Sequence, residues 1–260
     1  MERIILIETS TALCSAAFAE NGVITAYRES SAPKAHASLT AVFIQEVLSE
    51  SNLTLDDCDA ICVSKGPGSY TGLRVGVSTA KGICFGSRKP LIAVGTLDTL
   101  VAQADSVIPG LTGNPRFIIP MIDARRMEVY TAVFSQAAIP GHPDVITSEA
   151  EVIDGIAEAD AQESPRYIQI TETAPMIIDE NSFSEYLEQG EVLFIGDGAG
   201  KCADVIRHPN ARFHQCNPKA SAMLEPAIKA HKEKRFEDVA YFEPFYLKEF
   251  VATVSKKKLF

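Results

Sequence analysis

The stretch that decides the fold is Lys65-Gly66-Pro67-Gly68-Ser69-Tyr70-Thr71-Gly72-Leu73-Arg74-Val75-Gly76. It follows a short apolar run at 60–63, which is typical of a buried strand. It precedes a segment without proline at 77–86, which is typical of a helix. A glycine-rich turn between a strand and a helix can present backbone N–H groups to phosphate. The stretch therefore predicts an α/β fold and raises the question of a nucleotide site.

The glycine spacing does not match either common nucleotide motif. A P-loop has the pattern Gly, four residues, then Gly-Lys-Ser/Thr, but Gly66 is followed by no such trio and Gly72 is followed by Leu73. The dinucleotide fingerprint Gly-x-Gly-x-x-Gly begins at Gly66 and Gly68, but Thr71 stands at its third glycine position. A phosphate cradle is therefore the least favoured of the uses that we consider for this turn.

Small residues recur four apart along the segment that follows. Gly72, Gly76 and Ala80 would share one face of a helix and allow another backbone to approach closely. On the residues alone, packing against the chain's own sheet ranks first, and contact with a helix of a second molecule ranks next.

Composition restricts the class of protein. A length of 260 residues allows one large domain or two ordinary domains, and a hydrophobic content of 46% is enough to form their cores. Six cysteines without a Cys-x-x-Cys pair predict reduced core residues, and five histidines without ligand spacing argue against a metal site. The opening apolar run is too short for a signal peptide, and no run approaches the ~20 residues of a membrane span. We expect a soluble, cytoplasmic protein without membrane contact.

The net charge of −10 is unevenly distributed. Residues 1–102 carry −2, residues 103–217 carry −11 and residues 218–260 carry +3. An acidic middle section repels nucleic-acid phosphates, so independent tight tRNA or DNA binding is not expected. The basic end, Lys256-Lys257-Lys258, is more typical of a solvated terminus than of a nucleic-acid site.

Two halves of the chain repeat one pattern. Residues 3–7 read as a strand ending at Glu8, with a hairpin at Asn21-Gly22, and residues 116–122 read as a strand ending at Asp123. A strand, glycine turn and helix follow in each half, at 61–76 and at 192–201. This predicts a duplicated ribonuclease-H-like fold with mixed sheets flanked by helices. We expect an N-terminal lobe at 1–102 and a C-terminal lobe at 103–260, with an irregular insertion at 136–189.

An amphipathic helix is expected after the third strand of the first half. Ser38 is its expected N-cap. Its apolar positions form a broad stripe, in which we single out Leu39, Val42, Phe43 and Val47.

Only weak features point to catalysis. Glu8 and Asp123 stand where a duplicated ATPase would hold a metal or position water, and Gly196-Asp197-Gly198 resembles a nucleotide turn. The favoured alternative is structural, with carboxylates that cap nearby backbone N–H groups and glycines that supply positive φ. No serine, threonine or cysteine is paired in sequence with an activating base. We therefore assign no catalytic residue and no metal ligand.

Several segments resemble the bacterial TsaB (YeaZ) family. Residues 66–76 closely resemble its hallmark string, and Ile5-Leu-Ile-Glu-Thr-Ser10 resembles its opening strand. His36-Ala-Ser-Leu39, Met121-Ile-Asp-Ala-Arg125 with Glu128-Val-Tyr130, and Pro244-Phe-Tyr-Leu-Lys248 resemble three further family segments. Ser38 and Lys248 depart from the usual family residues.

The resemblance implies an actin-like, two-lobed fold and a paralogue of TsaD that is itself not an enzyme. TsaD transfers threonylcarbamoyl to adenosine 37 of ANN-decoding tRNAs. The chain would act as partner and activator of TsaD, with the ATPase TsaE as a third subunit, and would form a homodimer when alone. ATP and metal would belong to the partner subunits, this chain would carry no cofactor, and tRNA would be met only through the complex.

The resemblance also implies a helical partner interface in the N-terminal lobe. Combined with the two stripes, it predicts contacts by Leu39, Val42, Phe43, Val47, Gly72, Gly76 and Ala80. On this basis Gly76→Leu would abolish the heterodimer and leave the fold intact. The family-motif loop comprises Gly66, Pro67, Gly68, Ser69, Tyr70, Thr71, Leu73 and Arg74.

A vestigial nucleotide site would comprise Glu8, Asp123, Gly196, Asp197 and Gly198. A stand-alone ATP-binding, kinase-like enzyme of the actin-like superfamily is the alternative function. A peptidase is less favoured, because the sequence shows no arrangement of nucleophile or metal ligands.

Overall fold

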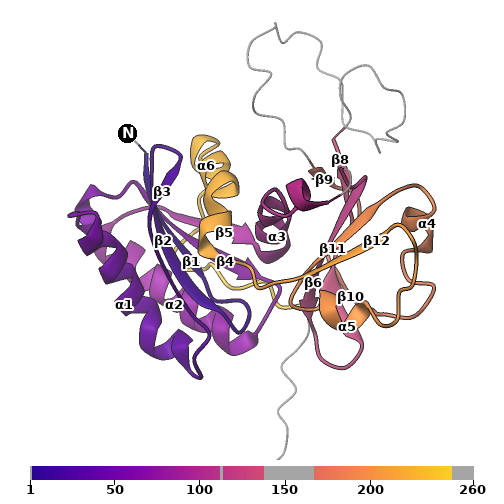
Figure 1. Cartoon of the computed structure of the whole chain (residues 1–260). Helices are drawn as coiled ribbons and strands as arrows, with labels where there is room; N and C mark the ends of the chain where they lie inside the picture. Colours follow the sequence, from indigo (N-terminus) through magenta and orange to yellow (C-terminus); the bar gives the residue numbers. More distant parts are fainter. Residues whose placement is uncertain (1, 112–113, 138–166, 248–260) are drawn as a thin grey trace, which may run out of the picture.

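A computed structural model of the chain describes residues 2–111, 114–137 and 167–247 and contains two β-sheets side by side (Figure 1). The first sheet has five strands, in the order β3 (Val23–Ser30), β2 (Cys14–Glu20), β1 (Arg3–Glu8), β4 (Ala60–Gly66) and β5 (Leu91–Gly95). Strand β2 runs antiparallel to its neighbours β3 and β1, whereas β4 and β5 run parallel to β1. The expected hairpin at Asn21-Gly22 is confirmed, since both residues adopt positive φ.

The second sheet repeats this order. Its central path is β10 (Ala174–Ile177), β7 (Glu128–Thr131), β6 (Phe117–Asp123), β11 (Val192–Gly196) and β12 (Ala211–Gln215). Strand directions match those of the first sheet, position for position. The duplicated ribonuclease-H-like fold is therefore confirmed. We call the units built on the two sheets the first lobe and the second lobe.

One part of the expected insertion belongs to the regular fold. Strand β10 supplies the third strand of the second lobe, although it lies within 136–189. Strands β8 (Phe134–Gln136) and β9 (Tyr167–Gln169) extend the sheet beside β6. Strand β7 ends at Thr131 and β8 begins at Phe134, so two separate strands follow β6. The rest of the expected insertion, and the Lys256–Lys258 end, lie outside the described residues.

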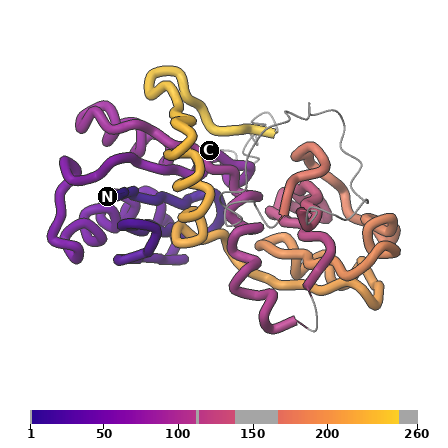
Figure 2. The backbone as a smooth tube through the Cα atoms, turned by 90° about the horizontal axis from the view of Figure 1, so that it is seen from above, coloured from indigo at the N-terminus to yellow at the C-terminus, as the bar shows by residue number. Residues whose placement is uncertain are grey.

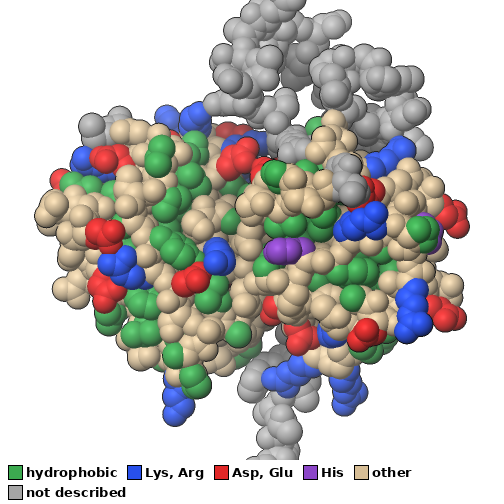
Figure 3. Space-filling view, viewed as in Figure 1, with side chains coloured by type: hydrophobic (Ala, Val, Ile, Leu, Met, Phe, Trp, Pro, Cys, Tyr) green, Lys and Arg blue, Asp and Glu red, His purple; other side chains and the backbone are tan. Residues whose placement is uncertain are grey.

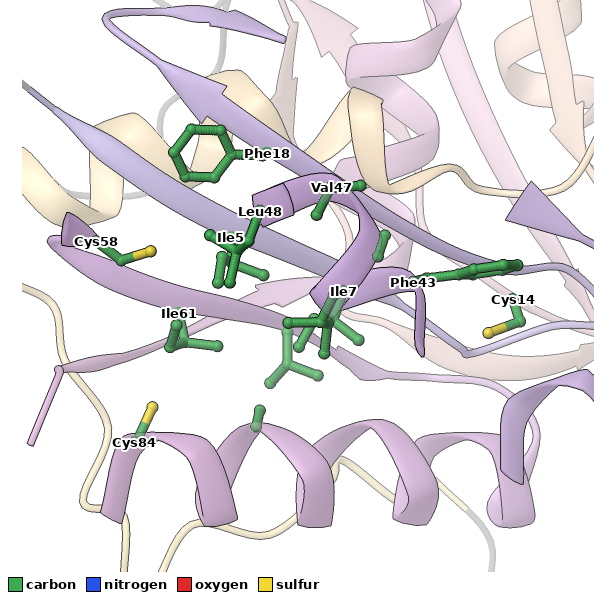
Figure 4. Packing of buried hydrophobic residues seen from close by; sticks show 14 of the residues in the cluster. Ile5, Ile7, Cys14, Phe18, Phe43, Val47, Leu48, Cys58, Ile61 and Cys84 are labelled. Atoms are coloured by element: carbon green, nitrogen blue, oxygen red, sulfur yellow. The ribbon is translucent and has the colours of Figure 1, made fainter. Parts of the chain in front are cut away.

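Helices cover both faces of the first sheet. Because side chains alternate along a strand, Ile5 and Ile7 of β1 face α1 (Ala35–Glu50) and α2 (Tyr70–Ser87), where Figure 4 shows their packing. Ile4 and Leu6 face the opposite side, against the 3₁₀ turn η3 (Ala220–Met223) and α6 (Leu224–Lys232). Two more short 3₁₀ turns lie at Leu55–Asp57 and Ile108–Gly110.

The remaining helices are α3 (Thr96–Ala104), α4 (Ser184–Leu187) and α5 (Ala199–Cys202). Figures 1 and 2 show α3 and α6 at the junction of the two lobes. The predicted division at residue 102 stays a prediction. It falls within α3, and α6 returns from the later part of the chain to the first sheet.

Two helix starts differ from expectation. Helix α1 begins at Ala35, after Lys34 in the left-handed region, so Ser38 is not its N-cap. The Ser38 hydroxyl instead donates to the Lys34 carbonyl at 3.1 Å. Helix α2 begins at Tyr70, because Ser69 caps it by accepting a hydrogen bond from the Gly72 N–H at 3.3 Å.

The described residues also bear on two expectations from composition. All six cysteines are free, and all but Cys216 are buried. Among the described residues, none of the helices combines the length and apolarity needed to cross a bilayer.

Candidate functional site

The family-motif loop contacts the far end of the described chain. Phe245 donates its backbone N–H to the Lys65 carbonyl at 2.7 Å, and the rings of Tyr70 and Tyr246 lie 4.9 Å apart. A side chain at Gly66 would place its Cβ 2.9 Å from the Phe245 carbonyl oxygen, at a φ of +104°. Gly66 is therefore required by this close approach. Two family segments that lie far apart in sequence meet at this point.

The other glycines of the motif pack against the turn after β1. A Cβ at Gly68, Gly72 or Gly76 would overlap atoms of Thr9 or Ser10, at separations under 3.0 Å. The Ser69 N–H is also used here, since it donates to the Ser10 carbonyl at 2.6 Å. The structure therefore supports the first alternative, packing within the chain, and the turn does not form a phosphate cradle.

This packing corrects part of the predicted partner interface. Phe43, Val47, Gly72, Gly76 and Ala80 are buried in the chain's own core and do not reach the surface. The expectation that Gly76→Leu would leave the fold intact is also contradicted, because the space beside Gly76 is filled by Thr9. A row of small residues shows that something approaches closely, but it does not show which segment does so.

Only Leu39 and Val42 of the predicted interface retain surface exposure. Val42 is 40% exposed, and Leu39 is half-buried. Both lie on α1, which packs beside α2 against the same face of the first sheet.

The outer face of α2 was missed by the sequence reasoning. Its most exposed apolar side chain is Phe85, at 83%. A Cβ added at Gly82 or Gly86 would meet nothing within 4 Å, so the surface around Phe85 is open. Exposed positions recur along the helix at helical spacing, at Thr71, Arg74, Ser78, Gly82 and Phe85. The sequence spacing could have revealed this face. Phe85 lies five residues after Ala80, so it does not share the helix face of Gly72, Gly76 and Ala80.

Glu8 has the structural role that the sequence favoured. Its side chain is 0% exposed, and Oε1 accepts hydrogen bonds from the Ser10 N–H at 2.6 Å and the Ser64 hydroxyl at 2.9 Å. Burial raises the pKa of this carboxyl. Its Oε2 atom finds no partner within the described residues. Glu8 thus caps the turn after β1 from inside the core.

Asp123 is bound within the second lobe. Its Oδ1 accepts from the Arg125 N–H at 2.9 Å and forms an ion pair with Lys201. The Lys201 ammonium also donates to the Arg126 carbonyl at 2.8 Å and the Glu128 carbonyl at 2.7 Å. Since a fixed ammonium repels a metal ion, this arrangement opposes a cation at Asp123.

The glycine turn after β11 packs tightly onto β6. A Cβ at Gly196, where φ is +133°, would overlap the Met121 carbonyl oxygen, and the Gly198 N–H donates to that oxygen at 2.9 Å. Asp197 Oδ1 accepts the Asp123 N–H at 2.9 Å, and burial raises the pKa of Asp197 to about 6. Asp123 and the predicted turn residues are thus brought together, and each has an internal structural partner. In the described ranges, no three His, Cys, Asp or Glu residues group as metal ligands.

Comparison with known proteins places the chain in a family. A family model described as TsaD, tRNA N6-adenosine threonylcarbamoyltransferase, matches residues 28–256. The Escherichia coli K12 protein TsaB, a "tRNA threonylcarbamoyladenosine biosynthesis protein", is 36% identical over 134 residues, which cover 52% of this chain and 55% of that protein. The Bacillus subtilis protein of the same description is 33% identical over 131 residues, covering 50% and 54%. The chain therefore spans about half the length of the curated relatives that it matches.

Solved structures share the fold over nearly the whole chain. YeaZ from Pseudomonas aeruginosa superposes with a TM-score of 0.73 at 22% identity, covering 95% of this chain and all of that one. A second structure, described as an uncharacterized protein with similarity to peptidase YeaZ from Pseudomonas aeruginosa, gives a TM-score of 0.75 at 21% identity with the same coverage. Because the family model spans most of the chain, the chain belongs to the TsaD family, and over about half its length it is similar to proteins named TsaB.

Proposed function

We propose that this chain serves the formation of threonylcarbamoyladenosine in tRNA as a partner subunit of TsaD, without catalysing the transfer itself. The observation that carries the proposal is the contrast between two regions. The acids of the nucleotide-like turns are engaged inside their lobes, whereas the outer face of α2 presents Phe85 to solvent. The curated relatives described as biosynthesis proteins for this modification support the pathway.

The residues of the second lobe support a non-catalytic role. A metal-dependent transferase needs carboxylates that are free to coordinate the ion. Asp123 already pairs with Lys201, and Asp197 bonds the β6 backbone. We therefore expect ATP and metal to be bound by the partner subunits, TsaD and TsaE.

The α2 surface supports a protein partner. A phenylalanine that is 83% exposed leaves apolar area in water, and burying it in an interface would contribute about 1.5–3 kcal/mol. Gly82 and Gly86 beside it allow a second helix to approach. The Arg74 guanidinium lies over the Tyr70 ring, with its Cζ atom 5.3 Å from the ring centroid, and it places a positive charge at the N-terminal end of the same face. We propose this outer face of α2, with Leu39 and Val42 of α1, as the surface for TsaD, and for a second copy of the chain when TsaD is missing.

The charge distribution supports contact with tRNA only through the complex. Figure 3 shows acidic and basic side chains interspersed over one face of the molecule. With a net charge of −10, such a surface lacks the long-range attraction that nucleic-acid binding uses.

The test is tRNA threonylcarbamoylation by purified TsaD and TsaE supplied with threonylcarbamoyl-adenylate, with and without this chain. We expect product only when the chain is added. Phe85→Ala should weaken activation and TsaD binding by about 10- to 150-fold, since one buried aromatic side chain is lost. Val23→Ala is the matched control, because Val23 is 60% exposed on β3, away from α2. Product formation that is indifferent to the chain would refute the proposal, and wild-type activation by Phe85→Ala would refute the assigned surface.

A further inference from the structure

The segment at 237–246, which we call the strap, runs beside α2 in the opposite direction. At its start, the Glu237 N–H donates to the Leu91 carbonyl at 2.8 Å, just beyond the end of α2. At its end, the Tyr246 ring lies 4.9 Å from the ring of Tyr70, the first residue of α2. The strap therefore lines one long side of α2 from end to end.

Two charged side chains fix the middle of the strap. The Lys81 ammonium on α2 donates to the Ala240 carbonyl at 3.2 Å and to the Phe242 carbonyl at 2.8 Å. The Asp238 carboxylate accepts from the N–H groups of Ala240 at 2.8 Å and Tyr241 at 3.3 Å. Phe242 also packs against the core of the first lobe. Tyr241 therefore stands on a turn whose backbone is held on both sides.

The Tyr241 side chain itself is left in solvent. It is 84% exposed, and Phe85 at 83% is the next most exposed of the large apolar side chains in the described ranges. The two rings belong to one surface. Lys81 lies one helical turn before Phe85, and Val239 of the strap lines the same groove as Phe85. An exposed aromatic ring on a fixed backbone loses little conformational entropy when it is buried, which is a property of interface anchors.

The size of a stable interface requires more surface than α2 offers. Such an interface uses about 20–30 residues on each side. The surface proposed above has five positions on α2 and two on α1, and most of those on α2 are small or polar. A partner on this face therefore has to contact the flanking segments as well. The strap adds three exposed aromatic side chains of the kind enriched at interfaces, Tyr241, Phe245 and Tyr246.

We propose that the surface for TsaD continues from α2 onto the strap, where Tyr241 is a second aromatic anchor beside Phe85. This proposal rests on the proposed function and names a further part of the same surface. The partner would offer an apolar depression for the Tyr241 ring next to the one that takes Phe85. Lys81 is a positioning residue, because it holds the turn that presents Tyr241.

The test is the Kd of the full chain for purified TsaD, measured by titration calorimetry. Tyr241→Ala should raise Kd at least about tenfold, whereas Tyr241→Phe keeps the ring and should stay within about threefold of the wild type. Thermal midpoints should be unchanged in both, because the side chain is in solvent. Ile177→Ala is the matched control, since Ile177 is 74% exposed on β10 of the second lobe and should leave Kd unchanged.

Lys81→Met tests the positioning role. It should raise Kd about fivefold in the wild type, because the turn is released from α2. In the Tyr241→Ala background it should add nothing, since its effect passes through the tyrosine ring. A lysine that only stabilised the fold would weaken binding equally in both backgrounds.

Four results would overturn the proposal. Tyr241→Ala binds TsaD like the wild type, the effects of Tyr241→Ala and Lys81→Met simply add, Ile177→Ala weakens binding as much as Tyr241→Ala, or Tyr241→Ala weakens only the self-association of the chain. In the first case a loss of TsaD binding by Phe85→Ala would still leave the proposed function standing. Absence of TsaD binding by the wild type would overturn both.

Discussion

Replacing Gly76 by alanine tests how α2 is packed against β1. The added Cβ would lie 3.3 and 3.4 Å from Thr9 Cβ and Cγ2 and would overlap Thr9 Oγ1. Overpacking of this kind destabilises a folded protein by about 1–3 kcal/mol. Gly82→Ala on the same helix meets nothing within 4 Å and should be stabilising by about 0.5–1 kcal/mol through helix propensity alone. Since the propensity gain is common to both variants, their difference isolates the packing term.

The measurement is the free energy of unfolding by urea, together with the thermal midpoint. For a protein of this size we expect the midpoint to fall by about 2–4 °C for each kcal/mol lost. Thr9→Ala should rescue Gly76→Ala, because it removes the overlapping Oγ1 atom. That hydroxyl has no hydrogen-bond partner within the described residues, so its loss leaves no buried group unpaired. The double-mutant cycle should give a coupling of about 1–2 kcal/mol.

Two results would refute this reasoning. Equal stability of Gly76→Ala and Gly82→Ala would mean that the two backbones are not in close contact. Zero coupling between residues 9 and 76 would mean that any loss of stability at Gly76 has another origin. In either case the small-residue row would again be open to a partner helix.

Two further predictions concern the turn that joins β6, β11 and α5. Burial raises the pKa of Asp197 to about 6, so the folded state keeps a proton that the unfolded state releases near pH 4. The wild type should therefore lose stability relative to Asp197→Asn as pH rises from about 4 to 6, and the difference should be constant above pH 7. Urea unfolding at a series of pH values measures this, and parallel stability curves for the two proteins would contradict it. Lys201→Met removes three hydrogen bonds of a largely buried ammonium and should lower the free energy of unfolding by about 2–4 kcal/mol. The control, Lys219→Met, breaks an exposed ion pair with Glu29 and should change that free energy by less than about 1 kcal/mol. A similar loss in both variants would show that Lys201 does not hold the turn.

Local patterns predicted the elements well where neighbouring residues decide the conformation. The Asn21-Gly22 hairpin depends on turn chemistry within a few residues. The start of α2 was predicted late because the glycines of 66–76 suggested a long turn. In the structure Ser69 caps the helix within that stretch, and tertiary contacts compensate for the low helix propensity of Gly72 and Gly76.

Strand β10 shows a second limit. Its short sequence, Ala174 to Ile177, has no strong strand pattern, and it becomes a strand because β7 offers it an edge. The repeat of the first lobe could have suggested a third strand here, but its position in the chain could not be predicted.

By itself, the sequence determined the duplicated fold, because short-range patterns of strand, turn and helix repeat in both halves, and it indicated the family through the motif at 66–76. Only the tertiary structure decided what each glycine faces. Gly66 meets Phe245, and Gly76 meets Thr9, each across a long separation in sequence. It also decided that Phe85 is exposed while Ala80 is buried. The physical reason is that spacing on a helix defines which residues share a face, whereas the packing of the whole chain determines which face is covered.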